Sequence, residues 1–425
     1  MHAWHRRTSL SVRAAPSPHE NHRENHRGQM RNHLTPCFGL RRCQSPPSKR
    51  LPFQISVNYD GMNNLVERNT VSYPIVVAGL LMALLPTAQA TDTLPGVYFS
   101  HHDWELVCDN TRACRAAGYH ADDDELKLSL LLTRKAGPGQ AVTGELKFGE
   151  LDDAELVNKM TPGTKFSLLI DQRVVGQAAL GKEGAAIPLP PDQVQLLLAA
   201  LRKSSKIEWV QGTHHWHLSD KGVAAVFLKM DEFQRRLGSK GALLKPGTLG
   251  EDKVLPALPA PVVVAVAPVK PRPADKQLIA GKAKPLRDAL RASVKGNDDC
   301  SDLEDDAAAK TPLTVNRLSA TKLLLSTACW RAAYNTGDGY WVINDAPPFA
   351  PVLVTASGVD YRDGKISASQ KGRGIGDCFS FDEWTWDGQK FVYTSSSSTG
   401  MCRLIAAGGT WSLPRIVSDV RTAPR

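Results

Sequence analysis

A glycine-rich segment close to the C-terminus carries residue types that can bind an anion. It reads KGRGIGDC over residues 371–378. Alternating glycines let backbone amides approach a ligand closely, and Arg373 can pair with an anion. The G-x-G-x-G spacing differs from the nucleotide-binding G-x-G-x-x-G, which a helix must follow. The alternative is a structural turn held by Cys378.

Two tryptophans follow this segment on one predicted strand. Trp384 and Trp386 lie two residues apart, so they share a face of the strand. There they can stack on a sugar or an aromatic ligand, or pack in a small β core. The ligand-binding residues that we predict are Gly372, Arg373, Gly374, Asp377, Trp384 and Trp386.

Two groups of histidines are candidate metal ligands: His101, His102 and His120 with Asp103 and the acidic run 122–124, and the run HHWH at 214–217. In the first group, adjacent residues of a strand point to opposite faces, which favours a solvated surface. In the second, His215 and His217 share a strand face, but no third ligand can be named. A polar strand face is favoured there, and no metal site is predicted.

The sequence has no catalytic motif of a known kind. It contains no G-x-S-x-G, no H-E-x-x-H and no phosphate loop, and residues 297–306 lack the glycine and the terminal glutamate of a calcium loop. We therefore predict no catalytic residue and no cofactor. The alternative is a hydrolase whose two carboxylates, such as Asp103 and Asp377, are brought to about 5–9 Å by the fold.

The cysteines and an apolar segment predict export. Cys37 and Cys43 precede this segment, and six cysteines follow it. An even number in an exported chain favours disulfides, and no C-x-x-C pair is present to begin a zinc site. Several pairings are possible. Proximity favours Cys108–Cys114, Cys300–Cys329 and Cys378–Cys402.

The apolar segment itself, IVVAGLLMALL at residues 75–85, is shorter than the roughly 20 residues of a membrane span. It matches the core of a secretory signal, with Arg68 before it and the small-x-small pattern Ala88-Gln89-Ala90 after it. We predict a signal peptide over 62–90. The mature chain is expected in the periplasm of a Gram-negative bacterium, without membrane insertion.

Most of the basic charge lies in front of the mature chain. Of the net charge of +9, residues 1–61 contribute 10 Lys+Arg against 3 Asp+Glu, and the 335 residues after Ala90 carry 41 against 39. Residues 1–61 lack an apolar period and are predicted to be disordered or an over-extended gene start before Met62. A nucleic-acid partner is therefore not predicted. The expected partner is an envelope protein or a small ligand.

The predicted fold class is α+β with two domains. Residues 91–250 are expected to form a mixed β-sheet with two helices, with strands near 103–108, 126–132, 142–148, 165–170, 207–211 and 215–218. One helix is expected after an N-cap at Asp192, with Val194, Leu197, Leu198 and Leu201 on its apolar face. The other is expected over 221–237, ending at Gly238, with Ala225, Leu228 and Phe233 among its apolar positions.

A Pro/Ala/Val-rich linker over 251–284 is predicted to separate the domains. Its prolines favour an extended chain, although the valines at 262–266 could form an edge strand. Residues 285–425 are predicted to form a mainly antiparallel β meander. Asp363-Gly364 and Asp387-Gly388 each stand between strand-forming residues, as in a two-residue hairpin that needs positive φ.

Several motifs together resemble a family of exported proteobacterial proteins known only as a domain of unknown function. The residues that match are DW at 103–104, CDN at 108–110, CRAAGY at 114–119, CWRAAYN at 329–335, KGRGIGDC at 371–378 and WTWDG at 384–388. The resemblance implies periplasmic export and no assigned activity. The middle of the N-terminal half is also similar in pattern to invasion-associated locus B proteins, which carry an additional cysteine pair. The predicted function is a soluble, disulfide-bonded periplasmic binding or envelope-associated module.

Overall fold

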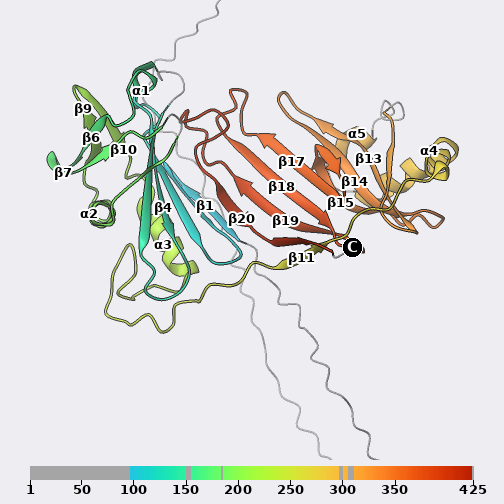
Figure 1. The fold of residues 1–425 in the computed structure, drawn as a ribbon, viewed down its shortest axis with the longest axis horizontal. Helices are drawn as coiled ribbons and strands as arrows, with labels where there is room; N and C mark the ends of the chain where they lie inside the picture. Colours follow the sequence, from blue (N-terminus) through green and yellow to red (C-terminus); the bar gives the residue numbers. More distant parts are fainter. Residues whose placement is uncertain (1–95, 150–154, 183–184, 296–299, 305–310, 424–425) are drawn as a thin grey trace, which may run out of the picture. The chain divides into compact units, whose positions relative to one another are not determined.

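The computed structural model describes residues 96–149, 155–182, 185–295, 300–304 and 311–423. The predicted upstream extension (1–61) and signal peptide (62–90) lie outside the described residues. The described residues belong to one compact unit, built mainly of antiparallel sheets (Figure 1). No helix within them is both long and apolar enough to cross a membrane. The prediction of a mostly β, α+β fold is confirmed.

A six-stranded sheet forms the centre of the N-terminal half. Its order is β1-β2-β3-β4-β5-β8, with β1 (Val97–His101), β2 (Trp104–Cys108), β3 (Cys114–Tyr119), β4 (Leu128–Arg134), β5 (Val142–Phe148) and β8 (Ile187–Pro188). Strand β4 is buried on both faces. Leu128, Leu130 and Leu132 face the main core, whereas Leu131 packs in a second cluster with Trp411. This second face explains why the apolar alternation of the segment is incomplete.

A four-stranded sheet and three helices complete this half. The sheet has the order β10-β9-β6-β7, with β6 (Lys165–Ile170), β7 (Arg173–Ala179), β9 (Ile207–Gln211) and β10 (His214–Leu218). The helices are α1 (Glu155–Asn158), α2 (Pro191–Leu201) and α3 (Val223–Phe233). Figure 1 shows α3 beside the six-stranded sheet, and the two make many contacts.

Both predicted helices form, with corrections at their ends. The residue preceding α2 is Pro190, so Asp192 lies in the first turn and is not the N-cap that we predicted. The predicted apolar face of α2 is buried as expected. Helix α3 ends at Phe233, before the predicted Gly238, and Leu228 is 46% exposed because Val226, Phe227 and Met230 form the buried face.

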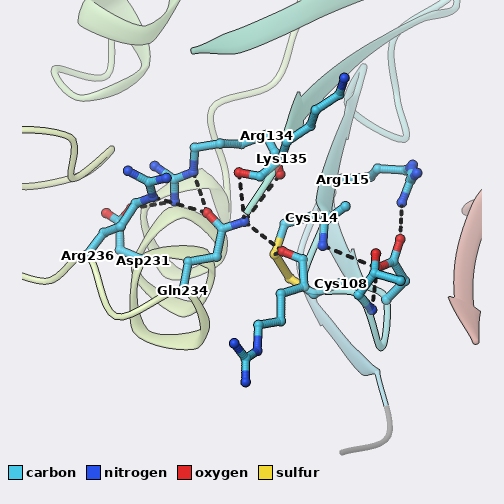
Figure 2. Close-up of a disulfide and its surroundings, with 12 residues drawn as sticks. Cys108, Cys114, Arg115, Arg134, Lys135, Asp231, Gln234 and Arg236 are labelled. Carbon is cyan, nitrogen blue, oxygen red and sulfur yellow. Dashed lines mark hydrogen bonds and ion pairs between the residues drawn. A yellow bond between two sulfur atoms is a disulfide. The ribbon is translucent and has the colours of Figure 1, made fainter. Parts of the chain in front are cut away.

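A buried polar network fastens α3 to β4 and ends that helix early (Figure 2). Arg134 Nη2 lies 2.8 Å from Asp231 Oδ1, and both side chains are 1% exposed. Arg134 Nε donates to Gln234 Oε1 at 2.7 Å, and Gln234 Nε2 donates to the carbonyl of Arg112 at 2.9 Å, inside the Cys108–Cys114 loop. After Phe233 the chain leaves the helix, and the side chains of Gln234 and Arg236 join this network. Arg236 donates to Gln234 Oε1 and to the carbonyl of Gly137.

Two antiparallel meanders form the C-terminal half, as predicted. The first contains β12 (Thr314–Arg317), β13 (Lys322–Arg331), β14 (Thr336–Asn344) and β15 (Val352–Gly358), and the second contains β16 (Asp360–Arg362), β17 (Lys365–Lys371), β18 (Phe379–Trp386), β19 (Phe391–Ser398) and β20 (Leu413–Ile416). Asp363 and Gly364 have φ of 49° and 84° and form the expected two-residue hairpin. The Asp387-Gly388 turn is longer, because Asp387 Oδ1 accepts the amides of Gln389 and Lys390.

Part of the predicted linker is regular structure. Strand β11 (Val262–Ala265) pairs in parallel with β21 (Asp419–Thr422), so the edge-strand alternative describes these valines. Helix α4 (Pro273–Val294) begins inside the linker range, because a proline at the first helical position loses no hydrogen bond. A four-residue helix, α5 (Ser301–Glu304), follows and contacts β13.

Each half has a hydrophobic core of its own, and another cluster contains residues of both. This shared cluster consists of Val107, Ala117, Tyr119, Leu131, Ile405, Trp411 and Leu413. The indole of Trp411 also donates to Ser129 Oγ at 2.8 Å. The segment after Cys402 therefore packs on the six-stranded sheet. The division into domains at 91–250 and 285–425 stays a prediction.

Candidate functional site

The predicted glycine-rich segment is a loop closed by an internal ion pair. Arg373 Nε donates to Asp377 Oδ1 at 2.7 Å, and Arg373 Nη2 contacts the other carboxylate oxygen. Asp377 is fully buried and also accepts the backbone amide of Leu404 at 2.8 Å. The guanidinium thus already holds an anionic group, a carboxylate from its own loop.

The glycines of this loop allow close packing. A Cβ on Gly372 would lie 2.5 Å from Cys378 Sγ and 2.8 Å from Cys402 Sγ, and one on Gly374 would lie 2.8 Å from the Tyr334 ring. Cys378 and Cys402 form a disulfide, as do the other two predicted pairs. Because both sulfurs are oxidised, they cannot join Asp377 as thiolate metal ligands, although the three groups are close together.

The two predicted tryptophans lie in different environments. Trp386 is 1% exposed and packs in a core with Ile366. Trp384 is half-buried at the edge of the same core and stacks on Tyr393, with ring centroids 5.0 Å apart. Trp386 is therefore a core residue, and Trp384 is partly exposed at the border of this core.

The two carboxylates of the hydrolase alternative are both held in ion pairs. Asp103 accepts from Arg403 at 2.8 Å and from Ser219 Oγ at 2.5 Å, and Asp377 accepts from Arg373 and Leu404. Each carboxylate therefore anchors one of the consecutive residues 403 and 404. Burial raises the pKa of Asp377, but its hydrogen bonds outweigh burial and hold this pKa below its ordinary value. A general acid needs the opposite shift.

Replacement of Asp377 by asparagine is expected to lower the free energy of unfolding by about 1–3 kcal/mol at pH 7. A carboxylate whose pKa is lowered by folding stabilises fully above its unfolded pKa of about 3.9, and loses this contribution as pH falls through the folded pKa. The difference between wild type and Asp377→Asn should therefore shrink below about pH 4. Urea unfolding at pH 7, 5 and 3 measures it.

The matched control is Asp363→Asn in the exposed hairpin turn, where asparagine also accepts positive φ. Its unfolding curves should follow wild type at every pH. An Asp377→Asn deficit that stays constant down to pH 3 would contradict the role given to the ionised carboxylate.

A cavity of about 220 Å³ lies on the side of β18 that carries Asp382. Asp382 accepts a hydrogen bond from Tyr393, the ring that stacks on Trp384. Its lining combines apolar surface with polar groups, and the residues that line it are Asp382, Arg415, Ser380, Ser396, Ser397, Ser398, Val107, Leu413 and Tyr98. This cavity is the candidate functional site.

Some polar groups of the cavity are hydrogen-bonded to one another, and Ser398 has no such partner among the described residues. Arg415 Nη2 donates to Ser396 Oγ at 3.3 Å. Burial and the hydrogen bond to Asp382 both raise the pKa of Tyr393, so its hydroxyl remains a proton donor at neutral pH. Ser398 Oγ is buried and has no hydrogen-bond partner among the described residues. A buried hydroxyl of this kind favours a polar ligand or a water molecule.

None of the ligand-binding residues predicted from the sequence lines this cavity. Trp384 is two residues from Asp382 on β18 and stacks on Tyr393, which donates to Asp382. The serine run at 395–398 was a usable signal, because alternate hydroxyls on a strand line one face. Arg415 had no such signal, since β20 reaches β19 only after the loop of residues 399–412.

In the first group of histidines, the rings of His101 and His102 contact each other, with centroids 4.3 Å apart. His101 and His102 are exposed, whereas His120 is 2% exposed and its Nδ1 lies 3.2 Å from the carbonyl of Leu128. Asp122 contacts Arg403, which also binds Asp103. This group therefore contains ion pairs and a packed histidine.

Together the fold and the site define a disulfide-bonded, mainly antiparallel β protein with a small cavity as its candidate binding site. The chain belongs to the family described as "Protein of unknown function (DUF1176)", whose model matches residues 98–418. It is similar to the uncharacterized protein YpfG of Escherichia coli (strain K12), with 26% identity over 344 residues, 75% of this chain and 92% of that protein. No solved structure matches the chain. The predicted resemblance to a domain-of-unknown-function family is confirmed.

Proposed function

We propose that this protein is an exported binding module that takes a small, uncharged, hydroxylated ligand of monosaccharide size in the cavity beside Asp382. The observation that carries this proposal is the pairing of Asp382 and Arg415 with serine hydroxyls in a cavity of about 220 Å³. Acceptor, donor and bifunctional groups thus line one small volume. The hydroxyl groups of a sugar, which both donate and accept hydrogen bonds, fit this set.

Charge and apolar surface narrow the ligand class further. One carboxylate and one guanidinium cancel, so the cavity does not select a strongly charged ligand. Val107 and Leu413 supply apolar surface for a C–H face, and Tyr98, 54% exposed, offers an aromatic ring for stacking. A phosphate or carboxylate group would meet the Asp382 carboxylate, which argues against an anionic ligand.

Periplasmic localisation is part of the proposal. Three disulfides among the described residues support an oxidising compartment, and the signal-like segment before Thr91 supports export. N-terminal sequencing of the protein from an osmotic-shock fraction should give a start near Thr91. A start upstream of Met62, or recovery only from the cytoplasm, would overturn this localisation. The likeness of the N-terminal half to invasion-associated locus B proteins stays a prediction.

Binding of a panel of neutral monosaccharides, followed by isothermal titration calorimetry, tests the ligand. Asp382→Asn should weaken binding of the best ligand by about tenfold or more, because a charged acceptor is lost. Asparagine keeps an oxygen for Tyr393, so the fold is preserved. The matched control is Glu383→Gln, one residue along β18, whose carboxylate pairs with Lys365 on the other face of the sheet. Equal loss in both variants, or no binding by any member of the panel, would contradict the proposal.

A further inference from the structure

The hairpin of β9 and β10 places three metal-ligand side chains on one face. Trp209 and Trp216 pair across it and are 0% and 1% exposed, so this face of the hairpin belongs to the core. His217 pairs with Glu208, one position further along each strand, and His215 lies two residues before it. Alternation therefore turns Glu208, His215 and His217 together to the face opposite the tryptophans.

The three side chains converge on one oxygen atom. Glu208 Oε2 lies 3.3 Å from His215 Nδ1 and 3.2 Å from His217 Nδ1. The Glu208 side chain is 3% exposed, whereas the imidazoles are 44% and 36% exposed. Burial raises the pKa of the Glu208 carboxyl, but hydrogen bonds from Lys206 and His215 outweigh burial and hold it below its ordinary value. A buried carboxylate thus faces two accessible imidazoles.

We propose that Glu208, His215 and His217 form a binding site for one divalent transition-metal ion of the zinc type. A Zn²⁺ ion bonds imidazole nitrogen at about 2.0–2.1 Å and carboxylate oxygen at about 2.0–2.2 Å, which at the tetrahedral angle separates N from O by about 3.3 Å. Both N–O distances of the cluster already have this value. Two imidazoles and one carboxylate form a ligand set that zinc uses with a fourth, open position.

The remaining adjustment is between the two imidazoles. Their ring centroids are 6.2 Å apart and nearly parallel, at 19°, whereas tetrahedral ligation at these bond lengths needs about 5 Å. Exposed rings can make this approach by side-chain rotation. Each Nδ1 must then present a lone pair, with the ring proton on Nε2, a tautomer that neutral histidine adopts.

Lys206 is the competitor that the site must displace. Its Nζ lies 2.8 Å from the same Glu208 oxygen, and its side chain is 56% exposed. In the absence of a metal, this ammonium group supplies the positive charge that the buried carboxylate needs. An arriving divalent cation would replace it, and the flexible side chain can move into solvent at little cost. Removal of Lys206 should therefore increase the affinity of the site for the metal ion.

The probe is Zn²⁺ alone, titrated into the full, untagged chain against a chromophoric chelator. Six histidines before residue 34 can bind additional Zn²⁺ ions weakly. The relevant quantity is therefore the dissociation constant of the one Zn²⁺ equivalent that binds most tightly. Glu208→Gln, His215→Ala and His217→Ala should each weaken this equivalent by at least about 100-fold, more than the loss of an outer-shell partner costs. Lys206→Gln should tighten it several-fold. Mg²⁺ should not compete, since it prefers oxygen ligands.

The matched control is His214→Ala. His214 is adjacent to His215 but lies on the tryptophan side of β10, with its ring 6.1 Å from Trp216. Zn²⁺ affinity should be unchanged in this variant, and thermal unfolding without metal should show that all variants are folded. The proposal is overturned if the three ligand variants bind Zn²⁺ as tightly as wild type does. It is also overturned if His214→Ala weakens Zn²⁺ binding equally, or if Lys206→Gln weakens it. Hydrogen bonds alone would then explain the cluster.

Discussion

Replacement of Asp231 by alanine is expected to lower the free energy of unfolding by about 3–5 kcal/mol. Arg134 and Asp231 are each 1% exposed, and the guanidinium would lose its carboxylate partner without gaining water. Burial already lowers the pKa of Arg134, which shows that its charge is costly where it lies. Asp231 Oδ2 also accepts the amides of Leu243 and Leu244, and both donors would be orphaned.

Urea denaturation followed by circular dichroism measures this loss. The matched control is Glu232→Ala, the next residue of α3, which is 57% exposed and pairs with Lys229 at the surface. That substitution should change the free energy of unfolding by less than about 0.5 kcal/mol. A double variant, Arg134→Met with Asp231→Leu, should recover part of the stability, since the unpaired buried charge is gone while the amides of Leu243 and Leu244 still lack their acceptor. A cost below about 1 kcal/mol for Asp231→Ala would contradict the argument.

Removal of the Cys300–Cys329 disulfide by the double substitution to alanine should cost about 3–4 kcal/mol. The bond closes a loop with a sequence separation of 29 residues, so it removes much conformational freedom from the unfolded chain. It also joins α5 to β13, and both cysteines are buried.

The Cys108–Cys114 pair provides the comparison. Its sequence separation is 6 residues, and the same chain-entropy argument predicts a loss of only about 2 kcal/mol. Urea midpoints of the two double variants, measured under oxidising conditions at one pH, give the order. If the short loop proves to cost more, the loop-entropy explanation is wrong for this protein, and local packing around Cys108 must account for the difference.

Local patterns in the sequence predicted the elements that local forces determine. Alternation placed β5, β6 and β9 at their observed bounds, and Asp363-Gly364 predicted its hairpin because only a few residues accept that backbone conformation. The end of α3 was missed for a tertiary reason. Gln234 leaves the helix to bind Arg134, which is 100 residues away in sequence, and no helix-ending signal records such a partner.

The candidate sites were predictable only to the extent that a single strand defines them. His215 and His217 follow from one strand, and the missing third ligand needed the register of the hairpin. A two-residue turn at Gly212-Thr213, with positive φ at Gly212, aligns His217 with Glu208, and this turn was readable in the sequence. The position of Arg415 was not predictable, because local sequence does not determine how β20 aligns with β19 across the loop of residues 399–412. Ligand binding by Arg373 stays a prediction, and the structure adds that its guanidinium pairs with Asp377 of the same loop.

The pairing of β11 with β21 determines when the structure can be completed. The two parallel strands, residues 262–265 and 419–422, are separated in the chain by both meanders, so their pairing closes a large loop. Contacts of such long sequence separation carry the entropy of closing a large loop, and they form late in folding. The N-terminal core, which draws only on residues 104–243, has no such requirement. Folding should therefore proceed from the N-terminal half, with the C-terminal strand as the final closing step.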